Sequence, residues 1–145
     1  MPERRRGYHL ATLTVRQLAT GLASNRILFG LGFVLVPAKA ARSWIGPVAS
    51  RPGGEVMVRA AGARDLALGV GALSALRSGA DARPWFAAHL ASDATDFAAT
   101  WAARRDLGPG RSAYALFMAG ASTAIAAAYL ARSGSDPAAS PPDQG

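Results

Sequence analysis

Apolar residues gather into four long blocks along the chain, and short segments rich in Pro, Gly and Arg separate them. Each block is close to the length of about 20 residues with which an α-helix crosses the hydrocarbon core of a bilayer. The pattern therefore predicts an all-α fold, a bundle of four transmembrane helices. We expect these helices at 15–36, 56–76, 85–103 and 113–131.

The residues between the blocks are of the kind that begin or end helices. Proline lacks a backbone N–H and clashes with the preceding turn, so it favours the first turn of a helix and is disfavoured in the interior. Prolines and glycines stand at the boundaries of the blocks: Pro37, Pro52-Gly53-Gly54, Pro84 and Gly108-Pro109-Gly110.

Two segments flank the predicted membrane domain, which covers residues 15–132. Residues 1–14 form a basic tail that includes Arg4, Arg5 and Arg6. Residues 133–145 contain mostly Ser, Pro, Asp, Ala and Gly. We expect this second tail to be disordered, because it has too little apolar surface to form a core.

The connection between the first two predicted helices has a composition of its own. Residues 38–45 combine polar Lys39 and Arg42 with apolar Trp44 and Ile45. Such a stretch is typical of a short amphipathic segment at the membrane interface. A simple loop anchored by Trp44 is the alternative.

The chain is strongly basic, with a net charge of +7 and an isoelectric point near 11.2. Most basic residues lie in the tails and loops, where arginines attract lipid head groups. No aromatic residues alternate with them, as a surface that stacks nucleic-acid bases would require. We therefore expect a multi-pass protein of the cell membrane with a lipid bilayer as partner, and no nucleic acid. Because of the basic run Arg4, Arg5 and Arg6, we expect both termini in the cytoplasm.

Five ionisable residues lie deep inside the predicted helices: Arg26 in the first, Arg64 and Asp65 in the second, and Asp93 and Asp96 in the third. At about 1.5 Å per residue they lie roughly 12 to 17 Å from the start of their helices, near the bilayer midplane. A charge there costs about 2.5 to 3.5 kcal/mol on insertion scales, so each needs a partner. We predict a buried polar layer of these five residues, the Arg–Asp layer, that joins the first three helices.

Asn25, Arg59 and His89 lie at the edge of this group. With Arg59 included, three arginines balance three aspartates, as a fully paired buried network requires. His89 shares one face with Asp93 and Asp96, because the three are spaced by four and three residues. These three side chains could offer a metal site, but nearby arginines would repel a cation, so we predict no metal.

The second predicted helix carries a stripe of small residues beside Asp65. Small side chains at this spacing allow another helix to come close, so we expect Asp65 to face a packed neighbour. The stripe consists of Gly62, Gly69 and Ala72. The fourth helix has only Ser122 and Thr123 as polar residues near its middle, and it is expected to act as a packing wall.

The chain has no cysteine, and it contains neither a phosphate-binding loop nor a dinucleotide fingerprint. The chain therefore has no thiolate that could act as a nucleophile or metal ligand, and no sequence motif typical of a cofactor site. We therefore predict no catalytic residue and no cofactor.

Two motifs resemble those of a family of small bacterial four-helix integral membrane proteins of unknown function. They are Gly62-Ala63-Arg64-Asp65-Leu66-Ala67-Leu68-Gly69 and, after Arg83-Pro84-Trp85, Asp93-Ala94-Thr95-Asp96. The resemblance covers residues 26–103 and implies the same membrane fold, with Arg64, Asp65, Asp93 and Asp96 as a shared site. It implies no activity. The architecture alone is similar to that of DoxX-like proteins.

Three functions fit this pattern. The leading hypothesis is a non-enzymatic membrane protein whose Arg–Asp layer is structural, or helps it dock with a second copy or with other membrane subunits. The second is a small proton- or cation-coupled carrier in which Asp93 or Asp96 binds the ion. The third is a membrane enzyme or redox accessory that handles a lipid or a quinone.

Overall fold

The computed structural model describes residues 3–133, with side chains from residue 15 onward, and every regular element in that part is helical. The predicted all-α class is thus confirmed. The four long helices are α1 (Glu3–Leu35), α4 (Pro52–Ser78), α5 (Arg83–Ala102) and α7 (Pro109–Ser133). Three short elements join α1 to α4, namely α2 (Pro37–Ala40), α3 (Arg42–Ile45) and the 3-10 helix η1 (Gly46–Ser50), and α6 (Arg104–Leu107) joins α5 to α7.

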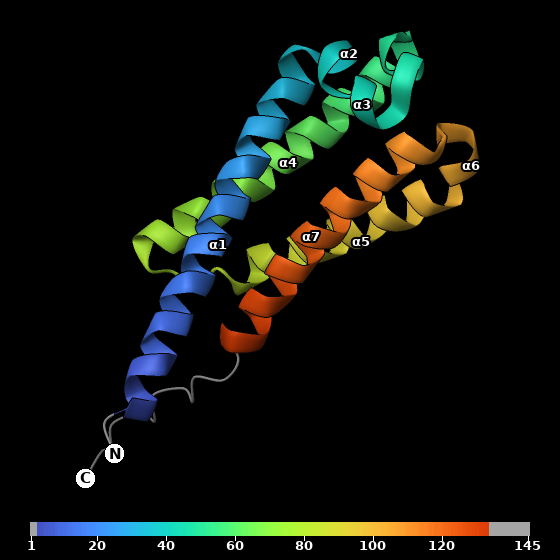
Figure 1. Cartoon of the computed structure of the whole chain (residues 1–145). Coiled ribbons are helices and arrows are strands. Elements are labelled where there is room, and N and C mark those ends of the chain that lie inside the picture. The colour runs from blue at the N-terminus through green and yellow to red at the C-terminus, as the bar shows by residue number, and fades with distance from the viewer. Residues whose placement is uncertain (1–2, 134–145) are drawn as a thin grey trace.

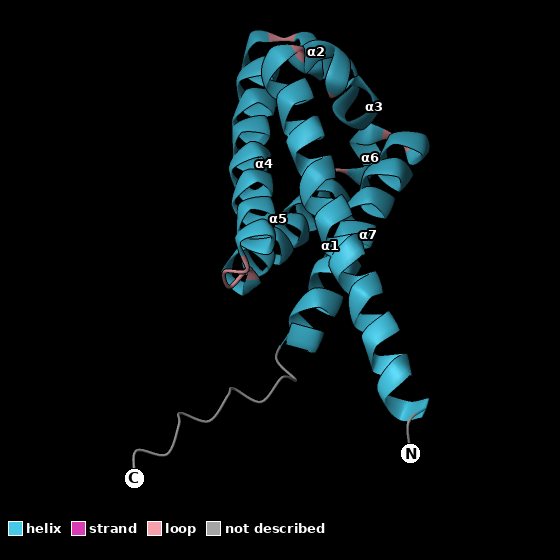
Figure 2. Cartoon of the chain, turned by 90° about the vertical axis from the view of Figure 1, so that its left-hand side faces the viewer, coloured by secondary structure: helices cyan, strands magenta, loops and turns pink. Residues whose placement is uncertain are grey.

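The long helices form two antiparallel hairpins. Helix α1 runs beside α4, and α5 runs beside α7, as Figure 1 and the turned view of Figure 2 both show. The start of α1 and the end of α7 lie at one end of the molecule, and the short elements α2, α3 and α6 lie at the other. Each hairpin therefore passes through the full length of the bundle.

The helix boundaries follow from the prolines and glycines of the connections. Pro52 is the first residue of α4, and Pro84 is the second residue of α5. The backbone N–H groups of the first turn have no acceptor within the helix, so a proline there costs no hydrogen bond. Helix α4 ends at Ser78, and the next residue, Gly79, has a φ of +75°, the left-handed conformation that glycine adopts without strain. Helix α1 begins at Glu3, well before the predicted start at residue 15. The segment predicted as a basic tail is therefore largely helical, and the predicted disordered tail, apart from Ser133, lies outside the described residues.

Helices α1 and α4 approach closely because glycines face each other across their contact. A methyl group built on Gly62 would lie 2.7 Å from Cβ of Phe33 and 2.9 Å from the carbonyl oxygen of Gly30. One built on Gly69 would lie 2.8 Å from the carbonyl oxygen of Ala23. The small-residue stripe of α4 therefore faces α1, as its spacing predicts.

Two apolar clusters lie on either side of the middle of the bundle. The first joins all four long helices and includes Leu22 of α1, Leu76 of α4, Phe86 of α5 and Ala126 of α7. The second lies toward the short elements and is built around Phe33. Arg26 of α1 belongs to neither cluster and lies between Leu22 and Phe33 along the helix.

The segment between α1 and α4 packs against the protein. The ring of Trp44 stacks on that of Phe33, with centroids 6.1 Å apart and an angle of 11° between the planes. Its indole N–H donates to the hydroxyl of Thr100 at 3.4 Å. The ring of Trp44 therefore contacts α1 and α5, and the predicted placement of residues 38–45 at the membrane interface stays a prediction.

Two helices, not four, are long and apolar enough to cross a membrane: residues 15–35 of α1, and α7. Helices α4 and α5 do not meet this criterion, because each carries ionisable residues near its middle: Arg59, Arg64 and Asp65 in α4, and His89, Asp93 and Asp96 in α5. Core helices of soluble proteins can have the same length and composition, so two such helices support a membrane location only weakly. The predicted count of four spans is not confirmed by helix composition.

Gly62→Ala is expected to lower the thermal unfolding midpoint of the detergent-purified protein, because the new methyl group overlaps Phe33 and Gly30 of α1. Overpacking of this kind costs about 1 to 3 kcal/mol. Gly21→Ala is the matched control, since nothing lies within 4 Å of its new methyl group. Equal midpoints for the two variants would contradict the close packing of α1 on α4.

Candidate functional site

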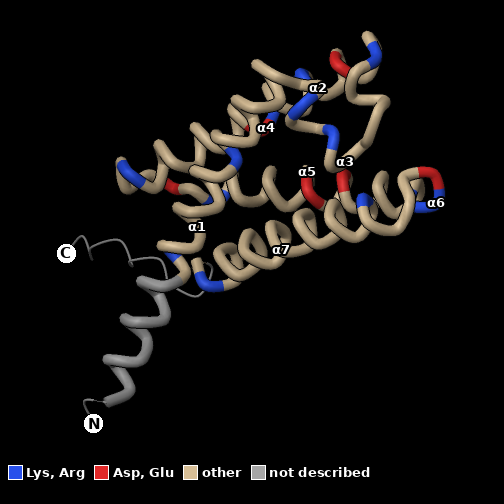
Figure 3. The backbone as a smooth tube through the Cα atoms, turned by 45° about the horizontal axis from the view of Figure 1, so that its top comes forward, with Lys and Arg blue, Asp and Glu red and all other residues tan. Residues whose placement is uncertain are grey.

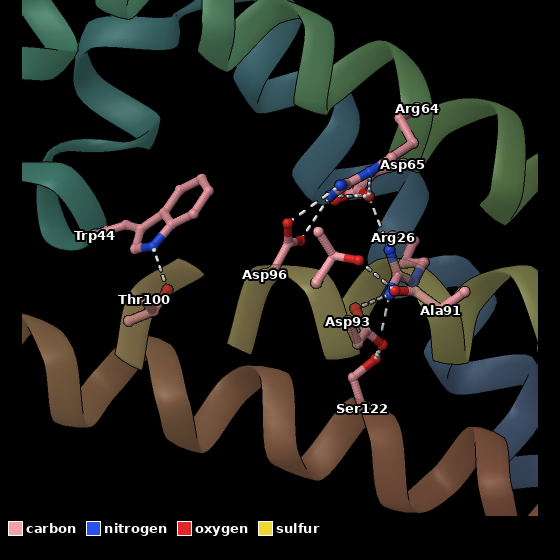
Figure 4. Close-up of polar contacts among 10 residues, drawn as sticks. Arg26, Trp44, Arg64, Asp65, Ala91, Asp93, Asp96, Thr100 and Ser122 are labelled. Carbon is pink, nitrogen blue, oxygen red and sulfur yellow. Dashed lines mark hydrogen bonds and ion pairs between the residues drawn. The ribbon is translucent and has the colours of Figure 1, made fainter. Parts of the chain in front are cut away.

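Arg26 is the central residue of the site, and it joins three helices. It lies on α1, and its side chain is only 6% exposed. Its Nη1 donates to Oδ1 of Asp65 on α4 at 2.7 Å, and its Nη2 donates to Oδ1 of Asp93 on α5 (Figure 4). The planar guanidinium presents several donors in fixed directions, so it can serve two carboxylates at once where a lysine could not.

A second ion pair lies beside the first and nearer to the surface. Arg64 of α4 donates two hydrogen bonds to Asp96 of α5, from Nη1 to Oδ1 at 3.1 Å and from Nη2 to Oδ2 at 2.7 Å. Its Nε and Nη2 also lie 3.3 Å from Oδ1 of Asp65. The side chains of Arg64 and Asp96 are 35% and 29% exposed, so this pair is less desolvated than that of Arg26.

The structure brings the five residues of the Arg–Asp layer together. Asp93 and Asp96 lie on one face of α5, and each turns to a different arginine. Asp65 contacts both arginines and so connects the two pairs. In Figure 3 the charged positions in the middle of the bundle come from α1, α4 and α5, whereas α7 carries none along its middle.

Arg59 does not take part in this layer. It lies one turn after Glu55 on the outer face of α4 and forms an ion pair with it at 3.0 Å, with 48% of its own side chain exposed. The predicted balance of three arginines against three aspartates is therefore wrong. The layer holds two arginines and three aspartates, which leaves one carboxylate in excess.

The other two peripheral residues occupy different surroundings. Asn25 lines a pocket beside the layer. His89 is fully buried and packs against Phe86, with ring centroids 5.1 Å apart. Within the part of the chain that the structure describes, no three His, Asp or Glu side chains lie close enough to hold a metal ion. His89, Asp93 and Asp96 therefore do not form the three-ligand site that their spacing allowed.

Ser122 is a member of the site that sequence reasoning missed. It lies in the middle of α7, and its hydroxyl donates to Oδ2 of Asp93. Nη2 of Arg26 also lies 3.5 Å from this hydroxyl. The fourth long helix is thus part of the polar network as well as a packing wall. The only signal in the sequence was the position of Ser122 and Thr123 as polar residues within an apolar helix.

A pocket of about 140 Å³ lies beside the layer, between the two hairpins. Arg26, Asp65, Asp93 and Asp96 line its polar side. Its apolar side is formed mainly by aromatic rings and a thioether, those of Phe29, Phe33, Trp44, Tyr114 and Met118. The pocket therefore joins carboxylates to an aromatic wall.

Comparisons with known proteins do not assign this chain to a family. No protein-family model matches the chain, and no curated protein or solved structure is similar enough to match it. The likeness to small bacterial four-helix membrane proteins stays a prediction. Function is therefore inferred from the contacts of the site itself.

Arg26→Gln is expected to lower the free energy of unfolding by about 3 to 5 kcal/mol, since it leaves Asp93 buried without its charged partner. Arg59→Gln is the control, because an exposed pair four residues apart on a helix contributes only about 0.3 to 0.5 kcal/mol. Denaturant unfolding in detergent, followed by circular dichroism, measures both. Similar losses in the two variants would contradict a central role for Arg26.

Proposed function

We propose that this protein is a four-helix integral membrane protein, in which α1, α4, α5 and α7 each cross the bilayer and the Arg–Asp layer is structural. In this proposal the layer clamps one hairpin to the other. The observation that carries it is the pairing of Arg26, whose partners Asp65 and Asp93 lie on different hairpins. The protein then acts without enzymatic chemistry, as a scaffold or a docking subunit.

The outer surface of the bundle supports the membrane location. Large apolar side chains are exposed on several helices, including Leu28 and Leu35 of α1, Met57 of α4 and Phe117 of α7, the last being 72% exposed. Only 6% of the apolar stretch of α7 is buried inside the protein. So extensive an apolar surface is unfavourable in water, and contact with lipid removes that cost.

The charges of α4 and α5 are compatible with crossing the membrane. Ionisable residues in transmembrane helices face the bundle interior and pair with one another. Asp65 and Asp93 both pair with Arg26, and Arg64 pairs with Asp96. Each of the four charged residues near the middle of these two helices therefore has a partner of opposite charge inside the bundle or at its edge.

The proposal includes an orientation and a docking surface. The start of α1 and the end of α7 lie at the same end of the bundle, as four crossings require, and the basic residues Arg4 to Arg6 place that end in the cytoplasm. A second copy or another membrane subunit would pack on α7. This helix exposes Phe117, and nothing lies within 4 Å of a methyl group built on its Gly120, so a partner helix could approach closely.

A structural layer predicts that Arg64→Gln and Asp96→Asn each destabilise the protein, by about 1.5 to 3 kcal/mol, the contribution of hydrogen bonds to charged groups. Arg64→Gln should lose more stability than Asp96→Asn. The first variant enlarges the excess of aspartates over arginines, whereas the second removes that excess. The double variant should recover part of the loss. Thermal unfolding in detergent measures all three. Single variants as stable as the parent protein would mean that the layer is not needed for assembly.

A small proton- or cation-coupled carrier is the second candidate function. The observation that favours it is the excess carboxylate of the layer, which a proton or a monovalent cation would neutralise. Asp96 is the most accessible of the three aspartates and lines the pocket. The third hypothesis, a lipid- or quinone-handling enzyme, has less support, because a pocket of about 140 Å³ encloses roughly one aromatic ring.

A carrier predicts that the protein in liposomes lets an imposed Na⁺ or K⁺ gradient change the internal pH, as reported by a trapped pH-sensitive dye. Asp96→Asn is expected to abolish this change, because the carboxylate that would exchange the ion is gone. Glu55→Gln is the matched control, since Glu55 pairs only with Arg59 on the outer face. No response in the parent protein, or an undiminished response in Asp96→Asn, would rule out this function.

A further inference from the structure

The pocket beside the Arg–Asp layer is built like a binding site for a small molecule. It lies between the hairpins, with the layer along one side, and the hydrogen bond from Trp44 to Thr100 spans the hairpins beside it (Figure 4). Its volume of about 140 Å³ is close to that of cavities of about 150 Å³ that take up benzene in other proteins. A ligand of about one ring and a short side chain fits this space.

The polar side of the pocket has more carboxylates than arginines. Three aspartates line it, and the two arginines that pair with them leave one carboxylate in excess. Asp65 also has an unused acceptor. The three hydrogen bonds that it receives all end on Oδ1, and among the described residues none ends on Oδ2. The side chain of Asp65 is 13% exposed and lines the pocket, so this oxygen is within reach of a ligand.

The apolar side of the pocket suits a cation. The stacked rings of Phe33 and Trp44 line it together with Phe29 and Tyr114. Aromatic faces attract ammonium groups through their quadrupole. A pocket lined by both carboxylates and aromatic rings is therefore complementary to an organic ammonium ion, which has a charged end and an apolar body.

We propose that this pocket binds a small organic ammonium ion. The ammonium N–H groups donate to Oδ2 of Asp65 and to the accessible carboxylate of Asp96, and the apolar body lies against Phe33, Trp44 and Met118. This inference shares the excess carboxylate with the carrier hypothesis, but binding requires no transport. It therefore stands or falls independently of the liposome experiment.

The competing chemistry is an anion. The Nε atom of Arg26, which lines the pocket, is buried and has no hydrogen-bond partner among the described residues. A ligand carboxylate could accept from it. The composition of the layer argues against an anionic ligand. Its three aspartates already outnumber its two arginines, and a further carboxylate would increase the excess of negative groups. The two chemistries are separated by ligands that share a body and differ only in charge.

Three such probes are 2-phenylethylammonium, the neutral 2-phenylethanol and the anionic phenylacetate. Each is titrated at pH 7 into the full chain in a nonionic detergent, and binding is measured by isothermal titration calorimetry. We expect 2-phenylethylammonium to bind about tenfold or more tightly than 2-phenylethanol, since one ion pair of about 1.4 kcal/mol gives that ratio, and phenylacetate to bind most weakly. Tighter binding of phenylacetate, or equal binding of the ammonium and the alcohol, would overturn the proposal.

Two variants locate the binding site. Ala119 lines the pocket from α7 and forms none of the ion pairs, so Ala119→Leu is expected to fill the pocket and abolish binding. Ala124→Leu, on the exposed face of the same helix, is expected to leave binding unchanged. Asp96→Asn removes the excess charge and is expected to bring the affinity for the ammonium probe down to that for the alcohol. If Asp96→Asn does not fold, the Ala119 and Ala124 variants decide the question. Binding that survives Ala119→Leu would place the ligand elsewhere and overturn the proposal.

Discussion

Arg26 is a permanently charged side chain in the middle of an apolar bundle. Because it is buried, the helices packed around it must supply carboxylates and hydrogen-bond acceptors for its guanidinium. Its side chain is 6% exposed, and the guanidinium pairs with Asp65 on one hairpin and Asp93 on the other. Ser122 of α7 completes the arrangement by donating to Asp93. A buried charge left without partners costs several kcal/mol, so the bundle is stable only when these elements meet at this level.

The close contact of α1 with α4 makes this meeting possible. Glycines at the contact let the two backbones approach, so that Arg26 on α1 and Asp65 on α4 come within 2.7 Å. Larger residues there would separate the helices and lengthen the ion pair. The same polar layer lies between two apolar clusters, around Leu22 and around Phe33, which fix its level along the bundle.

The excess carboxylate connects the structural role of the layer to ligand chemistry. A layer that only held helices together would be most stable if its charges balanced, because an unpaired charge is unfavourable in a medium of low dielectric constant. Here the imbalance lies beside a pocket with an aromatic wall. A proton, a metal cation or an organic ammonium ion would each restore neutrality, and the aromatic wall distinguishes the last of these from the first two.

The sequence by itself determined most boundaries of the four long helices, the start of α1 excepted, and which ionisable residues lie deep within them. Both depend on local properties: the prolines and glycines near Pro52 and Gly108 act on their own turns, and the depth of Arg26 or Asp93 follows from a fixed rise per residue. Only the tertiary structure decided the pairing of each arginine, the exclusion of Arg59, the recruitment of Ser122 and the pocket at Trp44. These depend on the rotation and spacing of whole helices, which are set by packing between residues far apart in the chain.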